Sequence, residues 1–204
     1  FGAAKVEGMS QAFVRLRVTD RAGRSAIGWS AEMMMPKWFD KSPDLSAQDN
    51  IEQLRHSVRI AMAGMAAAGI GTAFGLHAGL EIAHHAACAA AGLNGLIASF
   101  GLALVDRAVI DAVCRLEQIS AAVAVRENRL GITAATAPDL DGFDLAAFLA
   151  ARPSACSIAI RHTVGLGDVL TDAELETPLG DGLPETLEQV IGRNGHRWFK
   201  IKVS

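Results

Sequence analysis

The chain has 204 residues, of which 50% are hydrophobic and 20% charged, and its formal net charge is −3. This composition predicts a globular protein with one or two domains that each bury a core. Because there is no basic surplus to neutralise phosphates, it argues against a nucleic-acid partner. The three cysteines, Cys88, Cys114 and Cys156, are widely spaced and odd in number. They indicate neither a disulfide framework nor a thiolate metal site, and a reducing cytoplasm is the expected compartment.

Two uncharged stretches, residues 60–76 and 86–105, reach the length of a membrane span. They consist mainly of Ala and Gly, which add little to the free energy of membrane insertion. The ionisable residues His77, Glu81 and His84 lie between them, where a membrane would make them costly. We therefore expect buried helices of a soluble protein and no membrane partner.

The first predicted element is a β-hairpin. Apolar and polar residues alternate over residues 13–19, so that Val14 and every second residue after it share one face of a half-buried strand. Turn-forming residues follow at 20–23, and residues 25–30 can pair back as the second strand. The sequence predicts that one face of this hairpin is buried.

Residues 33–39 are too irregular for a strand and too apolar for an ordinary linker. A loop of this composition usually covers something, because exposed apolar patches tend to be functional. Two interpretations stay open at this point. The loop packs on its own domain, or it forms a lid over a site.

A helical layer is predicted next. Ser46 with an acidic residue three positions later forms a capping-box pattern at the start of a helix over residues 46–69. Apolar spacing predicts further helices over residues 73–91 and 96–125, and a short fourth helix over residues 143–151. Together these segments indicate a compact helical layer behind the hairpin.

The pattern changes after a break at Pro153. Residues 157–164 are typical of a strand, residues 184–193 of a helix opened by Pro, and residues 197–203 of a second strand. Strand, helix and strand at this spacing predict a βαβ unit with a parallel sheet.

Lys200 and Lys202 are alternate residues of the last predicted strand, so both side chains point to the same face. Two ammonium groups held close together and buried disfavour each other's charge, which would let one of them accept a proton near neutral pH. The pattern by itself favours another interpretation, a pair of solvated lysines that protect an exposed edge strand from aggregation.

The order of these features resembles the enolase superfamily, and within it the branch of mandelate racemase and muconate lactonizing enzyme. The features are an N-terminal α+β region, the apolar loop within residues 29–39, a helix containing residues 103–112, and a βαβ unit that ends in Lys200-Ile201-Lys202. The resemblance covers nearly the whole chain. Its specificity lies in the order of the elements, since a Lys-x-Lys pair is common in proteins.

The resemblance implies an α+β capping domain at residues 1–152, followed at residues 153–204 by the first βαβ of a (β/α) TIM-like barrel. It implies a magnesium-dependent enzyme that abstracts the α-proton of a carboxylate through an enediolate, as racemases, epimerases, cycloisomerases and acid-sugar dehydratases do. A full barrel takes about 250 residues. The barrel is therefore expected to be incomplete in this chain, with the metal ligands on later strands and no activity for the chain alone.

In the family's terms, Lys202 would be the base or acid at the carbon next to the substrate carboxylate, and Lys200 would tune it and help to hold that carboxylate. The resemblance also implies a small carboxylate or hydroxy-acid substrate, and the apolar helices leave surface that a homo-oligomer could bury. We expect five residues to bind the substrate or shape its access: Trp29, Met33, Met34, Trp38 and His162. For His162, a core or rim position is the simpler alternative.

Other patterns have plainer explanations. One helix face carries side chains that could bind a metal, namely His77, Glu81 and His84 or His85. Three ligands on one straight helix rarely converge on a single ion. We therefore expect these residues to have packing or surface roles. The glycine-rich residues 69–75 imitate a nucleotide-binding loop but follow a helix, which favours close helix packing instead. The alternative function is a noncatalytic helical interaction or membrane-associated module, which the Ala- and Gly-rich helices would suit.

Overall fold

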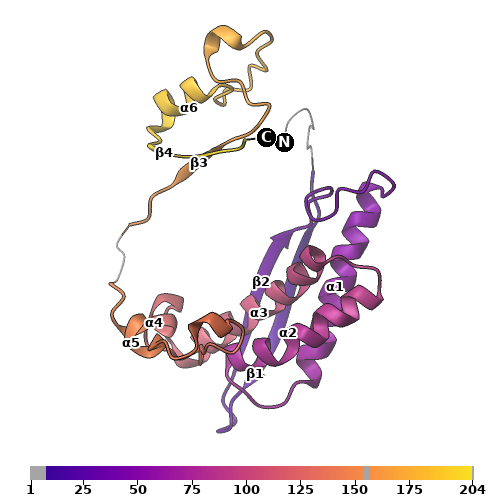
Figure 1. Cartoon of the computed structure of the whole chain (residues 1–204), viewed down its shortest axis with the longest axis vertical. Coiled ribbons are helices and arrows are strands. Elements are labelled where there is room, and N and C mark those ends of the chain that lie inside the picture. The colour runs from indigo at the N-terminus through magenta and orange to yellow at the C-terminus, as the bar shows by residue number, and fades with distance from the viewer. Residues whose placement is uncertain (1–7, 154–156, 204) are drawn as a thin grey trace. The chain divides into compact units, whose positions relative to one another are not determined.

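The computed structural model describes residues 8–153 and 157–203, which have a mixed α/β architecture with two small two-stranded sheets (Figure 1). These residues form two compact units. The first is Gly8–Pro153, and the second contains residues 157–203.

The first unit begins with the predicted hairpin. Strands β1 (Gln11–Thr19) and β2 (Ser25–Met33) pair antiparallel. Their turn is closed by Asp20, whose carboxylate accepts hydrogen bonds from the backbone N–H groups of Ala22 and Arg24, both at 2.9 Å. The predicted alternation is confirmed, because Val14 is buried whereas its neighbours in β1 are more exposed. The second strand is longer than predicted and ends at Met33.

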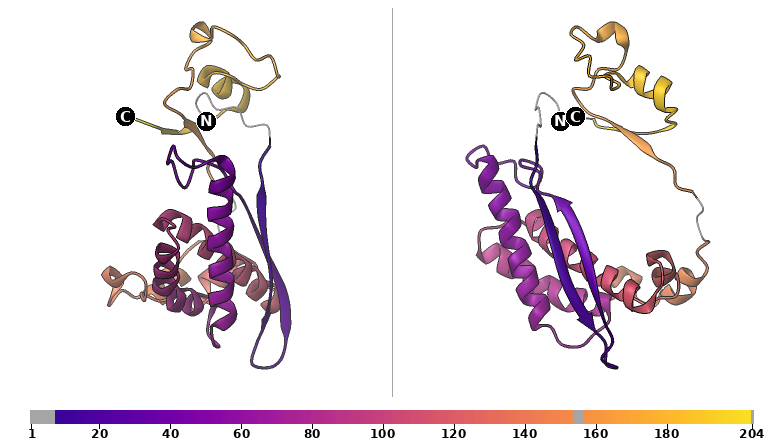
Figure 2. Two further views of the ribbon diagram at one scale, coloured as in Figure 1. Left: turned by 90° about the vertical axis from the view of Figure 1, so that its right-hand side faces the viewer. Right: turned by 180° about the vertical axis from the view of Figure 1, so that it is seen from behind.

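Three long helices follow, α1 (Ala47–Ala67), α2 (Ala73–Ala90) and α3 (Gly95–Glu117). Each begins behind a polar N-cap whose side chain accepts a backbone N–H, and the capping box predicted at Ser46 is present in full. Figure 2 shows the three helices on one side of the β1–β2 hairpin. Within the part of the chain that the structure describes, no helix is both long and apolar enough to cross a membrane.

Helix α3 is the centre of the first unit, and it lies very close to both β2 and α1. A Cβ atom placed on Gly28 of β2 would lie 2.0 Å from the carbonyl oxygen of Ala108, and one on Gly101 would lie 2.2 Å from Ser57 Oγ. Glycine is therefore required where these backbones meet. The close packing predicted for the glycines of residues 69–75 is wrong, because they meet only their own segment or open space.

Hydrogen bonds also tie β2 to α3. The Trp29 N–H donates to Asp111 Oδ2 at 2.9 Å, and the Ser30 hydroxyl donates to the Leu104 carbonyl at 2.5 Å. Partial burial would raise the pKa of Asp111, but the hydrogen bonds from Arg115 and Trp29 together with the Arg115 charge lower it overall. This face of the hairpin is thus held against the helix by polar as well as apolar contacts.

The helix predicted over residues 96–125 is wrong at its end. Helix α3 stops at Glu117, because Gln118 adopts a left-handed conformation with φ of 55°, and Ser120 then caps a separate helix α4 (Ala121–Arg126). The short fourth predicted helix is α5 (Leu145–Ala150), capped by Asp144. A 3-10 turn at Pro138–Leu140 precedes it.

The second unit contains β3 (Arg161–Val164), a 3-10 turn at Asp172–Glu174, α6 (Leu187–Asn194) and β4 (Trp198–Ile201). The two strands pair in parallel, which confirms the predicted βαβ unit. Both strands are shorter than predicted. Only the four residues of each strand, Arg161–Val164 and Trp198–Ile201, pair with the other strand. The helix does not open at Pro184, because Thr186 is its N-cap and accepts the Gln189 N–H at 3.1 Å.

Cys88 and Cys114 are buried free thiols, and burial raises the pKa of both. Cys156 lies outside the described residues, as do residues 1–7 of the expected capping domain and residues 154, 155 and 204 of the expected barrel opening.

Candidate functional site

The lysine pair is positioned by the loop and helix that join β3 to β4. Two backbone hydrogen bonds of 3.0 Å, from Leu187 N–H to Val169 O and from Glu188 N–H to Leu170 O, hold the loop to the start of α6. These bonds hold the segment that follows β3 against the helix that precedes β4.

A buried polar group supports this connection. The Thr186 hydroxyl is shielded from solvent and donates to Asp172 Oδ1 at 2.6 Å, and Gln189 Nε2 donates to the same oxygen at 2.9 Å. Sequence reasoning missed these three residues. The signal was available, because Thr186 and Gln189 have the spacing of a capping box.

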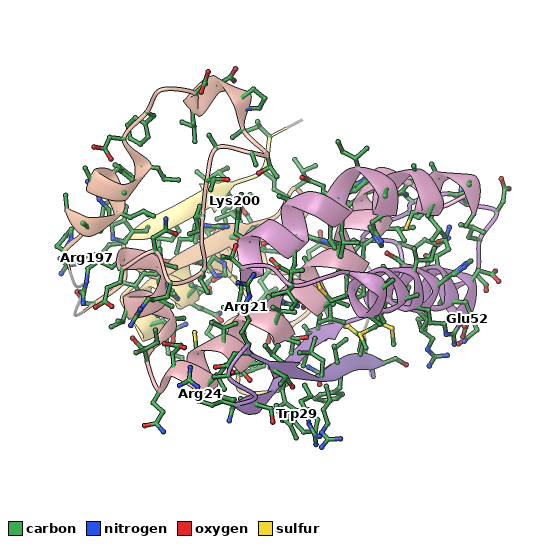
Figure 3. The ribbon with its side chains drawn as sticks, turned by 90° about the horizontal axis from the view of Figure 1, so that it is seen from below. Arg21, Arg24, Trp29, Glu52, Arg197 and Lys200 are labelled. Carbon is green, nitrogen blue, oxygen red and sulfur yellow. The ribbon has the colours of Figure 1, made fainter. Side chains whose placement is uncertain are left out.

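The register of the parallel pair decides which side chains share a face. Thr163 is the partner of Lys200, and the Lys202 N–H continues the ladder by donating to Val164 O at 3.0 Å. Alternation therefore places Lys200 and Lys202 on the face of Thr163 and opposite to Val164. Both lysine side chains are exposed, and Figure 3 labels Lys200 on β4.

The opposite face of the pair is only partly covered, because Ile201, the β4 partner of Val164, is 67% exposed. Val164 is buried, and the ring of His162 lies 5.8 Å from that of His196, which follows α6. His162 is half-buried, as a rim histidine would be, and alternation places it on the face opposite to the lysines.

The lysine face carries a further cation. Arg161 lies two residues before Thr163 on β3 and donates from Nη1 to the Thr163 hydroxyl at 2.8 Å. The face therefore presents two ammonium groups and one guanidinium group within the β3–β4 ladder. Such a group of donors is suited to a carboxylate anion, because charge-assisted hydrogen bonds to carboxylates are strong. Sequence reasoning did not single out Arg161, because only the register shows that it shares a face with Lys200.

The residues predicted to shape substrate access belong to the first unit. Trp29 and Met33 lie four residues apart on the same face of β2, and both are exposed on the outer face of the hairpin. The Arg15 guanidinium lies 5.4 Å from the ring centroid of Trp29, which Figure 3 labels. Phe13 is exposed on the same face, and sequence reasoning did not select it. The sequence contained a signal for Phe13, because alternation along β1 places it on the face opposite to the buried Val14.

The remaining two access residues lie in the apolar loop. Met34 is only 2% exposed and belongs to the hydrophobic core, whereas Trp38 is exposed in the turn that follows. The loop is anchored to its own unit by the Phe39 ring, 5.0 Å from that of Phe100, and by a 2.9 Å hydrogen bond from Lys37 N–H to Asn50 Oδ1. Packing on its own domain therefore accounts for the apolar character of this loop.

The histidines of α2 each have their own surroundings. His77 Nδ1 lies 3.7 Å from Asp106 Oδ2, His84 Nε2 lies 2.8 Å from the Ala98 carbonyl, and His85 Nε2 lies 3.5 Å from Ser99 Oγ. Within residues 8–153 and 157–203, no group of three or more His, Cys, Asp and Glu side chains is arranged to hold a metal ion. The cationic lysine face does not fit a magnesium ion either.

Comparison of the chain with models of protein families, with curated proteins and with solved structures finds no significant match.

Proposed function

We propose that this chain contributes a capping domain and the opening βαβ unit of a barrel to an enolase-like enzyme that removes the α-proton of a carboxylate substrate. One observation supports the proposal: Lys200 and Lys202 share the face of Thr163 on a parallel strand pair, opposite to the buried Val164, at the C-terminal end of β4. In a (β/α) barrel the helix-free face is the interior, and the C-terminal ends of the strands line the active site.

The cationic face suits the two tasks of such a reaction. Lys200 would bind the substrate carboxylate, and its positive charge would stabilise the negative charge that develops on the substrate as the α-proton leaves. Lys202, nearest the strand end, would accept the α-proton in its neutral amine form, so that a C–H bond breaks, an N–H bond forms to give the ammonium, and the electron pair stays on the substrate.

The resemblance implies a bound magnesium ion, but the described residues of the lysine face do not fit as its ligands. No step of the proposal is therefore assigned to the metal. Trp29, Met33 and Trp38 are exposed on the first unit and would be available to contact a substrate, whereas Met34 is buried in the core and would not.

The test uses the natural full-length protein with magnesium and a panel of α-hydroxy and sugar acids in D2O. Exchange of the α-proton for deuterium is followed by NMR. We expect Lys202→Ala to slow exchange by about 10²–10⁴-fold, the usual contribution of a general base. Lys41→Ala, which removes an exposed lysine from the first unit, is the matched control and should exchange normally.

Two results would contradict the proposal. Undiminished exchange in Lys202→Ala would remove the assigned base. No exchange with any acid by the wild-type protein would instead favour the alternative, a noncatalytic interaction module, for which Lys202→Ala should be silent.

A further inference from the structure

The two long edges of the β1–β2 hairpin differ in their hydrogen bonding. The sheet has two strands, so each strand has one edge that does not pair with the other. The edge of β2 is bonded to α3, because the Trp29 N–H donates to Asp111 Oδ2 at 2.9 Å and the Ala31 carbonyl accepts from Arg107 Nη2 at 3.3 Å. The backbone of β2 therefore has partners within its own unit.

The edge of β1 is open. The bonds at the two ends of the ladder, from Met34 N–H to Ser10 O and from Asp20 N–H to Arg24 O, belong to the even-numbered residues on the β1 side. Bonded and non-bonded pairs alternate in an antiparallel ladder, so the N–H and C=O groups of the odd-numbered residues within 11–17 point away from β2. Among the described residues, none bonds to these groups. They form a template for another strand.

An apolar groove of about 260 Å³ borders β1 and is lined by no residue of β2. Side chains of β1 and of all three long helices form its apolar wall: Leu16, Val18, Met62, Met65, Leu76 and Val109. In a strand added to β1, every second side chain would lie on the face of Leu16 and point toward the helices. The groove is thus placed to receive apolar side chains from alternate residues of such a strand.

The opposite face of the hairpin is cationic. Arg15 and Arg17 are exposed there, and Arg15 lies over the Trp29 ring. Neither guanidinium forms an ion pair with a described carboxylate, and the β1 and β2 residues on this face include no acidic residue. Cations along an edge disfavour pairing with a basic strand and favour pairing with an acidic one.

We propose that the open edge of β1 binds an extended segment of a partner protein in which apolar and acidic residues alternate. The main chain of the segment would bond to the odd-numbered residues of β1, which supplies affinity without regard to sequence. Its apolar side chains would enter the groove beside Leu16, and its carboxylates would pair with Arg15 and Arg17. This surface lies within Gly8–Pro153 and does not involve the lysine face.

The test compares two short peptides, one in which valine alternates with glutamate and one in which valine alternates with lysine. Each is titrated into the 15N-labelled full chain, and amide hydrogen exchange is followed by NMR. We expect the Val–Glu peptide to bind about tenfold more tightly or better. It should slow exchange at Phe13, Arg15 and Arg17 but not at Val14, whose amide faces β2.

Charge reversal of the edge tests the assigned arginines. The variant Arg15→Glu with Arg17→Glu alters only exposed side chains and should prefer the Val–Lys peptide instead. Lys41→Glu with Arg197→Glu, which changes the net charge equally at exposed positions outside the hairpin, should keep the wild-type preference.

Three results would overturn the proposal: unchanged exchange at the edge with the Val–Glu peptide, equal affinity for the two peptides, or an unaltered preference in the charge-reversed variant. Protection of the edge amides before any peptide is added would overturn it as well. Protection that rises with protein concentration would identify a second copy of the chain as the occupant, and constant protection would identify another segment of the same chain.

Discussion

The two units of this chain differ in how well they bury their own apolar residues. In the first, α3 is covered by the hairpin on one side and by α1 and α2 on another, and Leu104 is 0% exposed. In the second, Val164 and Val190 are buried, but Ile158 is 87% exposed and Leu179 81%. A two-stranded parallel sheet with one helix has too little surface to cover its apolar side chains. The second unit therefore leaves a larger share of its apolar side chains exposed than the first.

The largest expected effect comes from a substitution in the core of the first unit, which buries its apolar residues more completely. Leu104→Ala removes a fully buried side chain from the centre of α3 and should lower the free energy of unfolding by about 2–5 kcal/mol. Guanidinium denaturation followed by far-UV circular dichroism measures the change. Val190→Ala, in α6 of the second unit, should leave the same transition in place. An equal shift in both variants would mean that the units unfold together.

A smaller effect is expected where backbones meet. Gly28→Ala would place a Cβ atom 2.0 Å from Ala108 O and 2.5 Å from Ala112 N, so α3 must shift, at a cost of about 1–3 kcal/mol. In the second unit, a Cβ atom on Gly192 of α6 meets nothing within 4 Å. Gly192→Ala should be neutral or slightly stabilising, because alanine favours helices. Thermal unfolding of the two variants compares them directly, and similar losses would contradict the difference in packing.

The smallest expected effect concerns a carboxyl group of the first unit. Burial raises the pKa of Asp106, although the charge of His77 opposes the shift. A raised pKa means that folding favours the protonated form, so its stabilising contribution is present below the ordinary value of 3.8 and is lost as the pH rises through the folded value. Asp106→Asn, which stays uncharged, should therefore be more stable than wild type at neutral pH.

Thermal unfolding across a pH series checks this prediction. The advantage of Asp106→Asn should shrink as the pH falls through the window in which Asp106 becomes protonated. Glu176→Gln, an exposed carboxyl in the second unit, should show no comparable advantage. A loss of stability in Asp106→Asn at neutral pH would show that the interaction with His77 outweighs burial.

Local patterns accounted for most of the secondary structure. The alternation around Val14 predicted β1, and Ser46 with Asp49 predicted the start of α1, because both signals depend on residues a few positions apart. The end of α3 was missed, since the left-handed conformation of Gln118 has no strong sequence signature. Of the candidate site, the shared face of Lys200 and Lys202 followed from alternation, whereas the contribution of Arg161 needed the strand register.

The sequence by itself determined the hairpin, the capped start of α1 and the parallel βαβ unit, because hydrogen bonding and periodicity act over short stretches of chain. Only the tertiary structure decided that Met34 is buried while Met33 is exposed, that Gly28 is needed against α3, and that the buried His84 lines a cavity between α1 and α2. These outcomes depend on which distant segments pack together. Side-chain volume and hydrogen-bond geometry decide them, and both depend on residues that are distant in sequence but close in space.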